Sequence, residues 1–430
     1  MKGESLSVFI AVIVLVTASG TELISIESAL GSVQLLYPIF AVAMFLATLR
    51  RFPTRISWDF LLFALLFLSL IPSVVYSIHQ SKSMAILARI AISYVAVAGC
   101  IRTLYGIAPI STVAGFIWSY RLQIVIAALL FYTGRQPMSE VDFGGSRAHL
   151  FYYEPSYMGI SLGPFVAWCI IRCFYVDYNT SSIAYVIADI ILLLLLLVIT
   201  KSAMLLLLIA TAVIVVPVLL PQSQSLLRFR YVMTSLGCIA IIAGIVIGND
   251  KDDLLTNTIR DLATAEDKMS YLQQRSQNRY PRIVATLNTM LDFPIHGVGI
   301  GCFEEYSHSI SMTEFSSDLV SKLVRGKPGV NAFLETGAEA GFPGFLGLTF
   351  FLAGVFFVAW KSAVTFAGIL RIDQSDVAQL FFGPIGMLLM MIALSGASNA
   401  FRPYFWVVIG LNLGIASSCR NFKFNISHQQ

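Results

Sequence analysis

Charged residues are scarce in this sequence. Only 12% of its 430 residues are Asp, Glu, Lys or Arg, whereas a soluble domain has about 25%. Hydrophobic residues make up 57% of the chain and the mean hydropathy is +0.79, so water alone cannot solvate its surface. The composition therefore excludes an ordinary water-soluble enzyme and indicates a protein solvated by lipid.

The sequence also has no disulfide framework, no metal-ligand cluster and no basic patch. Its 6 cysteines lie in or beside apolar runs, except Cys302, which stands in a long polar segment. The net charge is only +4 and the positive residues lie between apolar runs, so nucleic acid is not an expected partner. Asp250 and Asp252 have the spacing of a metal-binding carboxylate pair, but acidic residues beside a membrane are usually only solvated. We therefore predict no metal and no other cofactor.

Long apolar runs, in contrast, are abundant. A helix that crosses a bilayer needs roughly 20 apolar residues. Twelve candidate segments lie near residues 6–24, 33–49, 58–79, 84–105, 110–132, 155–175, 182–200, 202–220, 231–248, 341–363, 378–397 and 402–419. The first has no convincing cleavage site and is interpreted as a retained helix. The sequence thus predicts an all-α integral membrane protein with about 12 transmembrane helices.

The distribution of basic residues predicts how these helices are oriented. Lys and Arg in short loops mark the cytoplasmic side of a membrane protein. Most of them follow the even-numbered runs, as Arg50 and Arg102 do, whereas the first alternate loop holds Glu22 and Glu27 and no basic residue. Lys82, in the second alternate loop, is a minor exception. Both termini are therefore expected in the cytoplasm.

This orientation divides the chain into three parts and places one large loop outside the cell membrane. The parts are residues 1–248 with the first nine helices and an external loop at 132–155, residues 249–340 as the large loop, and residues 341–430 with the last three helices. Lys201 and Arg402 also fall on the external side. Basic residues on that side need a reason, and most of them could converge on one surface.

Within the large loop the pattern is helical. Ser276 or Asn278 can cap a helix and Pro281 suits its first turn. Apolar residues then recur at spacings of three and four and give the helix one apolar side; they are Ile283, Leu287, Met290 and Leu291.

Arg279 and Arg282 are three residues apart and neighbours on one face of this predicted helix. The first turn of a helix favours an anion, and guanidinium groups match phosphate oxygens two at a time. A pyrophosphate is therefore a candidate guest, and the alternative is a solvated basic face. The external Arg135, Arg147 and Lys201 favour the anion site.

Two neighbouring patterns leave alternatives open. Gly297, Gly299 and Gly301 alternate after Pro294, which suits either a phosphate-cradling loop or a tight turn at the membrane surface. Glu154 precedes a predicted spanning helix and suits a helix cap, a general base toward a sugar hydroxyl, or a group that holds an arginine.

Three charged residues lie inside apolar runs, where isolated charges are costly. Arg89, Arg121 and Asp189 either pair with one another or line a wet cavity. A transporter would show the same feature.

With these residues in view, the chain resembles the superfamily of O-antigen polymerases and O-antigen ligases over nearly its whole length. Three motif regions carry the resemblance: Arg147 through Glu154-Pro155-Ser156; Arg279-Tyr-Pro-Arg282 followed by Asp292-Phe-Pro294-Ile-His-Gly297-Val-Gly299-Ile-Gly301; and Asn331-Ala-Phe-Leu followed by Glu339-Ala-Gly341-Phe-Pro-Gly344.

The resemblance implies a GT-C-like membrane glycosyltransferase of the bacterial inner membrane, whose large loop is mostly helical and periplasmic. Its donor and acceptor would be undecaprenyl-pyrophosphate-linked glycans, and a chain-length regulator is a further expected partner. We expect catalytic roles for Arg147, Glu154, Arg279 and Arg282. Substrate-binding roles are expected for Arg135, Lys201, Gly297, Gly299, Asn331, Glu335, Glu339 and Arg402.

One departure separates two reactions within the superfamily. The ligases typically have a histidine directly before the asparagine of the third motif, where this chain has Val330. This favours a polymerase that joins repeat units over a ligase that transfers glycan to lipid A core, although His296 or His308 could substitute. A flippase or transporter is the alternative from another class, but transporter halves usually show an internal repeat, and none is found here.

Overall fold

A computed structural model describes the chain over residues 25–28, 31–34, 58–134, 155–174, 180–200, 202–220, 279–309, 326, 328–370, 374–398 and 401–427. Structural statements below refer to these residues. The predicted helices at 6–24 and 231–248 and nearly all of the one at 33–49 lie outside them.

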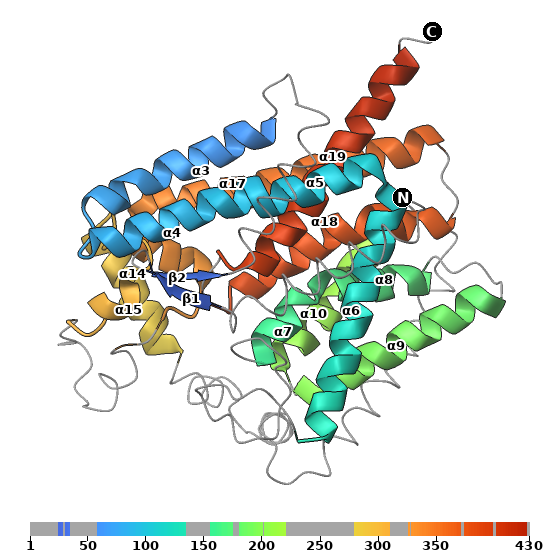
Figure 1. Ribbon diagram of the computed structural model, residues 1–430, viewed down its shortest axis with the longest axis horizontal. Coiled ribbons are helices and arrows are strands. Elements are labelled where there is room, and N and C mark those ends of the chain that lie inside the picture. Colours follow the sequence, from blue (N-terminus) through green and yellow to red (C-terminus); the bar gives the residue numbers. More distant parts are fainter. Residues whose placement is uncertain are drawn as a thin grey trace.

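The described part is a bundle of helices with one small hairpin (Figure 1). Its helices are α3 (Trp58–Val75), α4 (Gln80–Ile92), the π-helix η1 (Ser93–Ala98), α5 (Gly99–Ile107), α6 (Pro109–Tyr132), α7 (Pro155–Ser161), α8 (Gly163–Phe174), α9 (Thr180–Thr200), α10 (Ala203–Leu219), α14 (Tyr280–Asp292), α15 (Phe303–Tyr306), α17 (Ala332–Leu370), α18 (Gln374–Leu394) and α19 (Pro403–Ser427). Each predicted spanning segment that falls wholly within these residues coincides with one or more helices.

The hairpin was not expected from the sequence. β1 (Ser25–Ser28) and β2 (Gly31–Gln34) pair antiparallel, so the predicted helix at 33–49 begins within a strand. Ile26 lies opposite Val33 in the register, and β-branched residues are frequent in strands.

Length and apolar composition identify six candidate membrane spans among the described residues. They are Trp58–Val75, Gln80–Ile107, Pro109–Tyr132, Ile183–Thr200, Ala332–Gly368 and Val377–Leu394; shorter apolar helices are Gly163–Phe174, Met204–Leu219 and Tyr404–Ser418. The chain is therefore a multi-pass membrane protein. α9 and α10 are separate helices, because the hydroxyl of Ser202 accepts a hydrogen bond from the backbone N–H of Leu205 and caps α10.

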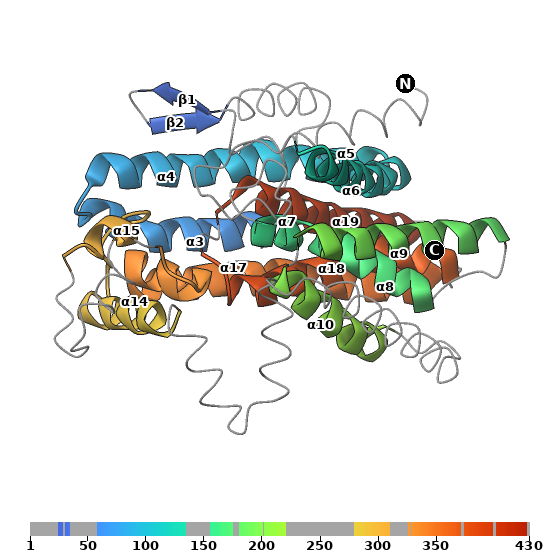
Figure 2. The same ribbon diagram turned by 90° about the horizontal axis from the view of Figure 1, so that it is seen from below.

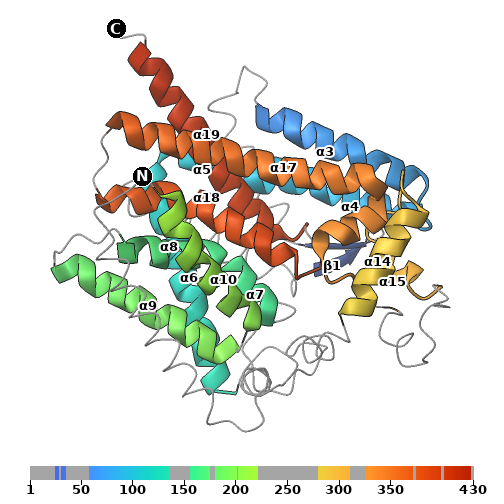
Figure 3. The ribbon, with the colours of Figure 1, turned by 180° about the vertical axis from the view of Figure 1, so that it is seen from behind.

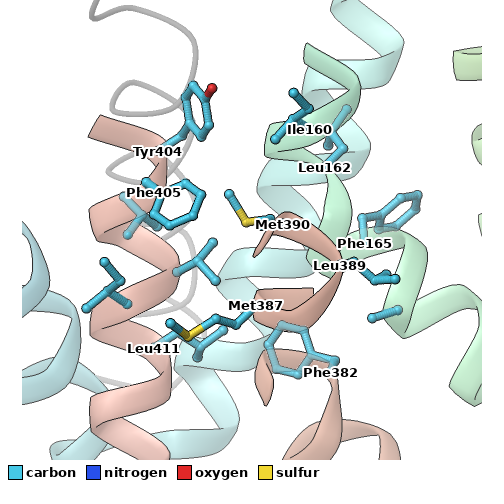
Figure 4. Close-up of a cluster of buried hydrophobic side chains, with 14 of the residues drawn as sticks. Ile160, Leu162, Phe165, Phe382, Met387, Leu389, Met390, Tyr404, Phe405 and Leu411 are labelled. Carbon is cyan, nitrogen blue, oxygen red and sulfur yellow. The ribbon is translucent and has the colours of Figure 1, made fainter. Parts of the chain in front are cut away.

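The core forms where α18 packs against α8, α17 against α3, and α19 against α5 (Figures 1 and 3). Side chains of α18 such as Phe382 and Met390 lie between those of α8 and α19 (Figure 4). Glycines allow the closest approaches: a Cβ atom at Gly386 would lie 2.5 Å from Cα of Pro164. Small residues at helix contacts are typical of membrane bundles, where tight packing replaces the hydrophobic effect.

The intramembrane charges of α6 and α9 pair with each other. Arg121 donates two hydrogen bonds to the carboxylate of Asp189, at 2.7 and 2.9 Å, and the indole N–H of Trp168 donates a third at 3.1 Å. The guanidinium of Arg121 also lies 5.0 Å from the ring centroid of Trp118. The first of the two alternatives is thus confirmed for this pair, which links α6 and α9 to α8.

A bend divides α17 into a short helix and a spanning helix. Gly341 has a φ of 69°, a conformation that favours glycine, and the next residue but one is Pro343, which has no N–H. The N–H of Phe342 donates to the carbonyl of Pro294 at 2.8 Å instead of to Ala338. The carbonyls of Ala338 and Glu339 therefore lose their helical donors.

The glycine-rich segment that follows α14 supplies the missing donors. The N–H of Val298 donates to the carbonyl of Ala338 at 3.0 Å, and that of Gly299 donates to Glu339 at 2.9 Å. On its other edge, the carbonyl of Val298 accepts from the N–H of Ile78 at 3.2 Å, in the turn between α3 and α4. This segment is therefore held between the bend of α17 and the turn that joins α3 to α4. Because it connects α14 and α15, it fixes both helices against the bundle.

We predict that breaking the Arg121–Asp189 pair destabilises the protein. Arg121→Ala should lower the free energy of unfolding by about 3–5 kcal/mol, because a carboxylate stays buried without its counter-charge. Thermal unfolding of the purified protein in detergent measures this. The double variant Arg121→Met/Asp189→Leu, which removes both charges, should recover most of the loss, and an equally unstable double variant would contradict the prediction.

We also predict a steric cost at Gly297. A Cβ atom there would lie 2.2 Å from the backbone carbon of Glu339, and the φ of 65° is unfavourable for alanine. Gly297→Ala should therefore cost about 3 kcal/mol of unfolding free energy, at the upper end for overpacking. Gly368→Ala is the control, since nothing lies within 4 Å of a Cβ atom at that helical position; equal melting temperatures for the two variants would rule out the close contact.

Candidate functional site

The ends of five helices meet at one side of the bundle. They are the first turns of α7, α10, α14 and α19 and the turn that follows α18. Close approaches tie them together: Cβ atoms at Gly159 and Gly396 would lie 3.3 Å from the hydroxyl oxygen of Ser202 and 2.7 Å from the terminal methyl of Met204. The distribution of basic residues predicts that these same helix ends share one membrane surface. The basic residues expected there include Arg279 and Arg402, which lie in the described part of the chain.

Arg279 reaches this meeting point from α14. It is the N-cap residue of that helix, not Ser276 or Asn278 as the sequence suggested, and its side chain makes no capping hydrogen bond. The guanidinium is exposed, and Nη1 donates to the carbonyl of Gly396 at 3.4 Å. A positive group at a helix N-terminus adds to the field of the free N–H groups, so the position favours an anion.

Arg282 has a different environment from Arg279. Its Nε and Nη2 both donate to the carbonyl of Pro328, at 3.0 and 2.6 Å. The fork therefore holds the chain segment that leads into α17. Glu335 packs against the same segment: a Cβ atom placed on Gly329 would lie 3.0 Å from the Cβ atom of Glu335. Although Arg279 and Arg282 are close in sequence, the first faces the helix ends and the second holds a loop.

Asn331 is the N-cap of α17. Its Oδ1 accepts hydrogen bonds from the N–H groups of Phe333 and Leu334, at 3.0 and 3.1 Å. A side-chain oxygen that satisfies the first free donors of a helix stabilises the helix start. The geometry thus gives the side-chain oxygen of Asn331 a structural role, and its contact with substrate stays a prediction.

Gly297 and Gly299 also serve the framework. The N–H of Gly297 donates to Phe293 at 2.9 Å and that of Gly299 donates to Glu339, so both donors are used within the protein. Of the two alternatives left by the sequence, the tight turn fits this geometry, because a phosphate cradle needs N–H groups that point at the ligand.

Glu339 is buried beside a charged pair. Its Oε1 accepts from the N–H of Phe303 at 3.4 Å, where α15 begins. Nearby, Lys82 of α4 forms an ion pair with Glu305 of α15. This contact accounts for Lys82, the minor exception in the second alternate loop, since an acidic residue of the large loop faces it.

Arg402 lies on the aromatic ring of Tyr157, with 3.9 Å between Cζ and the ring centroid. The hydroxyl of Tyr157 is hydrogen-bonded to that of Ser398 at 2.7 Å. Burial lowers the pKa of the Arg402 guanidinium from its usual value, although an arginine still stays charged at neutral pH. Sequence reasoning missed Tyr157 and Ser398; the only signal was the position of Tyr157 directly after the Glu154-Pro155-Ser156 motif.

Several predicted site residues lie outside the described part of the chain. They are the catalytic candidates Arg147 and Glu154, the substrate-binding candidates Arg135 and Lys201, and the weighed metal pair Asp250 and Asp252. Within the described ranges, no group of three His, Cys, Asp or Glu side chains could hold a metal ion.

Comparison with known proteins identifies the region around this site. The sequence model of the family described as O-antigen ligase matches residues 188–349. The matched range extends from α9 into α17 and includes Arg279, Arg282 and Glu339. A search among curated proteins finds no match. The chain therefore carries, over residues 188–349, a domain of the O-antigen ligase family of membrane glycosyltransferases, which build surface polysaccharides from lipid-linked glycans.

Proposed function

We propose that this protein polymerises undecaprenyl-pyrophosphate-linked oligosaccharide repeat units into O-antigen or a related surface polysaccharide. The reaction takes place on the periplasmic face and needs no metal. The observation that carries the proposal is the position of Arg279, whose exposed guanidinium lies at the meeting point of helix ends, against the turn that precedes Arg402. Two cationic groups from distant parts of the chain thus approach one turn, as a diphosphate site requires.

The chemistry makes clear demands on such a site. A hydroxyl of the acceptor sugar attacks the anomeric carbon of the donor glycan, and a new carbon–oxygen bond forms. The bond to the lipid pyrophosphate breaks, and the pyrophosphate departs with the bonding electron pair. Preorganised donors stabilise the negative charge that develops on this leaving group. The hydroxyl proton passes to a base, and Glu154 is the residue we propose for that role.

In this proposal the charged candidates form two groups. We assign diphosphate binding to Arg279 and Arg402, with Arg147, Arg135 and Lys201 as further candidates from neighbouring segments. Arg282, Glu335 and Glu339 support the site from the framework side, since each lies on or beside a segment that holds α14 or α17 in place.

A ligase is the second candidate function, because the matched family is described by that activity. The position before Asn331 is Val330, whose side chain has no group that can accept or donate a proton. His296 and His308 are both engaged within the loop: Nδ1 of His296 lies 2.6 Å from the carbonyl oxygen of Gly297, and the ring of His308 packs against Gly326. These environments favour the polymerase. The family match disfavours a flippase.

A deletion strain separates these activities. For a polymerase, we expect surface glycan that carries a single repeat unit, because transfer to the lipid core needs a different enzyme. Gel analysis of the lipopolysaccharide measures chain length. Complete loss of glycan from the lipid core would instead identify a ligase, and loss of lipid-linked units from the outer leaflet would identify a flippase.

Single substitutions test the roles of the two arginines. Arg279→Ala should lower the turnover number about 100- to 1000-fold, the usual cost of a missing donor to a developing negative charge. Arg279→Lys should recover little of this, because an ammonium lacks the fork. The readouts are repeat-unit transfer by the purified enzyme and its melting temperature.

Arg282→Ala is the matched variant, since it removes a guanidinium from the same turn of helix. It should lower the unfolding free energy by about 1.5–3 kcal/mol through loss of the charged hydrogen bonds to Pro328. Arg279→Ala should melt as the wild type does. Normal glycan chain length in Arg279→Ala cells would remove that residue from the proposed site.

A further inference from the structure

Helix α14 exposes most of the side that the sequence predicts to be apolar. That side consists of Ile283, Leu287, Met290 and Leu291, and in a water-soluble loop it would be buried. In the structure Met290 is buried, but Ile283, Leu287 and Leu291 are not. All three are exposed, Leu287 by 38%, whereas the adjacent Thr286 is 1% exposed. We call these three side chains the apolar stripe of α14.

The buried face of α14 contains two hydroxyl groups beside the apolar Ala285 and Met290. Thr286 and Thr289 face inward, and each donates its hydroxyl hydrogen to a carbonyl of its own helix, Arg282 at 2.6 Å and Ala285 at 2.8 Å. Such internal bonds satisfy a polar group without water. A helix that buries threonine and exposes leucine is unfavourable in water, because burial of apolar surface is the main driving force of folding there. The same arrangement is favourable in lipid.

The apolar stripe continues onto the outer face of a spanning helix. Ile295, three residues beyond α14, is 68% exposed, and the neighbouring Pro294 accepts the hydrogen bond of Phe342. From Phe342, exposed apolar residues follow α17 at Leu346 and Phe350. These lie within the candidate span Ala332–Gly368, so we expect them to face acyl chains in the membrane. One continuous apolar surface therefore runs from the bilayer onto α14.

We propose that α14 is seated in the boundary between lipid headgroups and acyl chains, with its apolar stripe against phospholipid tails. α14 lies beside the first turns of α17, on the side away from α3 and α4 (Figure 2). The exposed Asn288 and Asp292 border the stripe and suit the headgroup side. An amphipathic helix in this position is stabilised by the apolar area that it removes from water.

This seating has a consequence for depth in the membrane. Arg279 is the residue directly before α14, so its guanidinium would lie at the level of the headgroups. A diphosphate attached to a lipid carrier lies at that level without leaving the membrane. The seating of α14 rests on burial and packing and is independent of the reaction proposed above.

Photo-crosslinking tests the proposal in the full-length protein. The photoreactive residue p-benzoylphenylalanine replaces Leu287 in one variant and the adjacent Asn288 in a matched variant, and Phe350 in a lipid-facing reference. Each protein is reconstituted in nanodiscs of defined phospholipid, irradiated and analysed by intact-mass and peptide mass spectrometry. We expect phospholipid adducts at positions 287 and 350 and only background yields at 288.

Three results would overturn the proposal. Crosslinks from position 287 to another segment of this chain would show that the protein itself covers the stripe. Crosslinks to a second copy would show a protein interface. Equal background yields at 287 and 288, with adducts at 350, would place α14 in water. Because no turnover is measured, a negative result in the glycan assays would leave this outcome unaffected.

Discussion

The bend of α17 leaves two backbone carbonyls without hydrogen-bond donors from their own helix. The rest of the site depends on how these carbonyls are satisfied. Ala338 and Glu339 lose their donors because Phe342 bonds elsewhere and Pro343 has none to offer. Unpaired backbone groups are costly in a membrane protein. The segment after α14 satisfies both carbonyls, and its own other edge is satisfied by Ile78. Two distant motifs of the sequence are therefore parts of one hydrogen-bonded joint, which holds the segment after the last turn of α14 against the bend of α17.

Contacts between distant segments explain why residues that look alike in sequence have different roles. Arg279 and Arg282 lie on one turn of helix, yet Arg282 donates to a carbonyl of the segment that leads into α17. The glycines of the second motif also look like a ligand-binding loop. Close contact with Glu339 and Ser77 explains them instead, since a Cβ atom at Gly297 or Gly299 would overlap those residues.

Several charged side chains of the bundle form ion pairs between helices. Arg121 and Asp189 neutralise each other inside the membrane-spanning region, and Asp59 pairs with Arg102 where α3 begins. Lys82 meets Glu305 of the large loop. Among the described residues, Arg279 donates to a backbone carbonyl at 3.4 Å, and Arg402 lies on an aromatic ring. Both arginines lie near the turn after α18, where we propose that the diphosphate binds.

The sequence by itself determined the class of the protein, most of its helices and the motifs that belong to its functional region, because apolar length, basic-residue distribution and short motifs are local properties. It also predicted that separated basic residues approach one surface. Only the tertiary structure decided that Arg282 binds the segment before α17 while Arg279 faces the helix ends, that Asn331 caps α17, and that the apolar stripe of α14 faces outward. Those outcomes depend on contacts between segments far apart in the chain, and on whether water or lipid surrounds a helix, which periodicity alone does not specify.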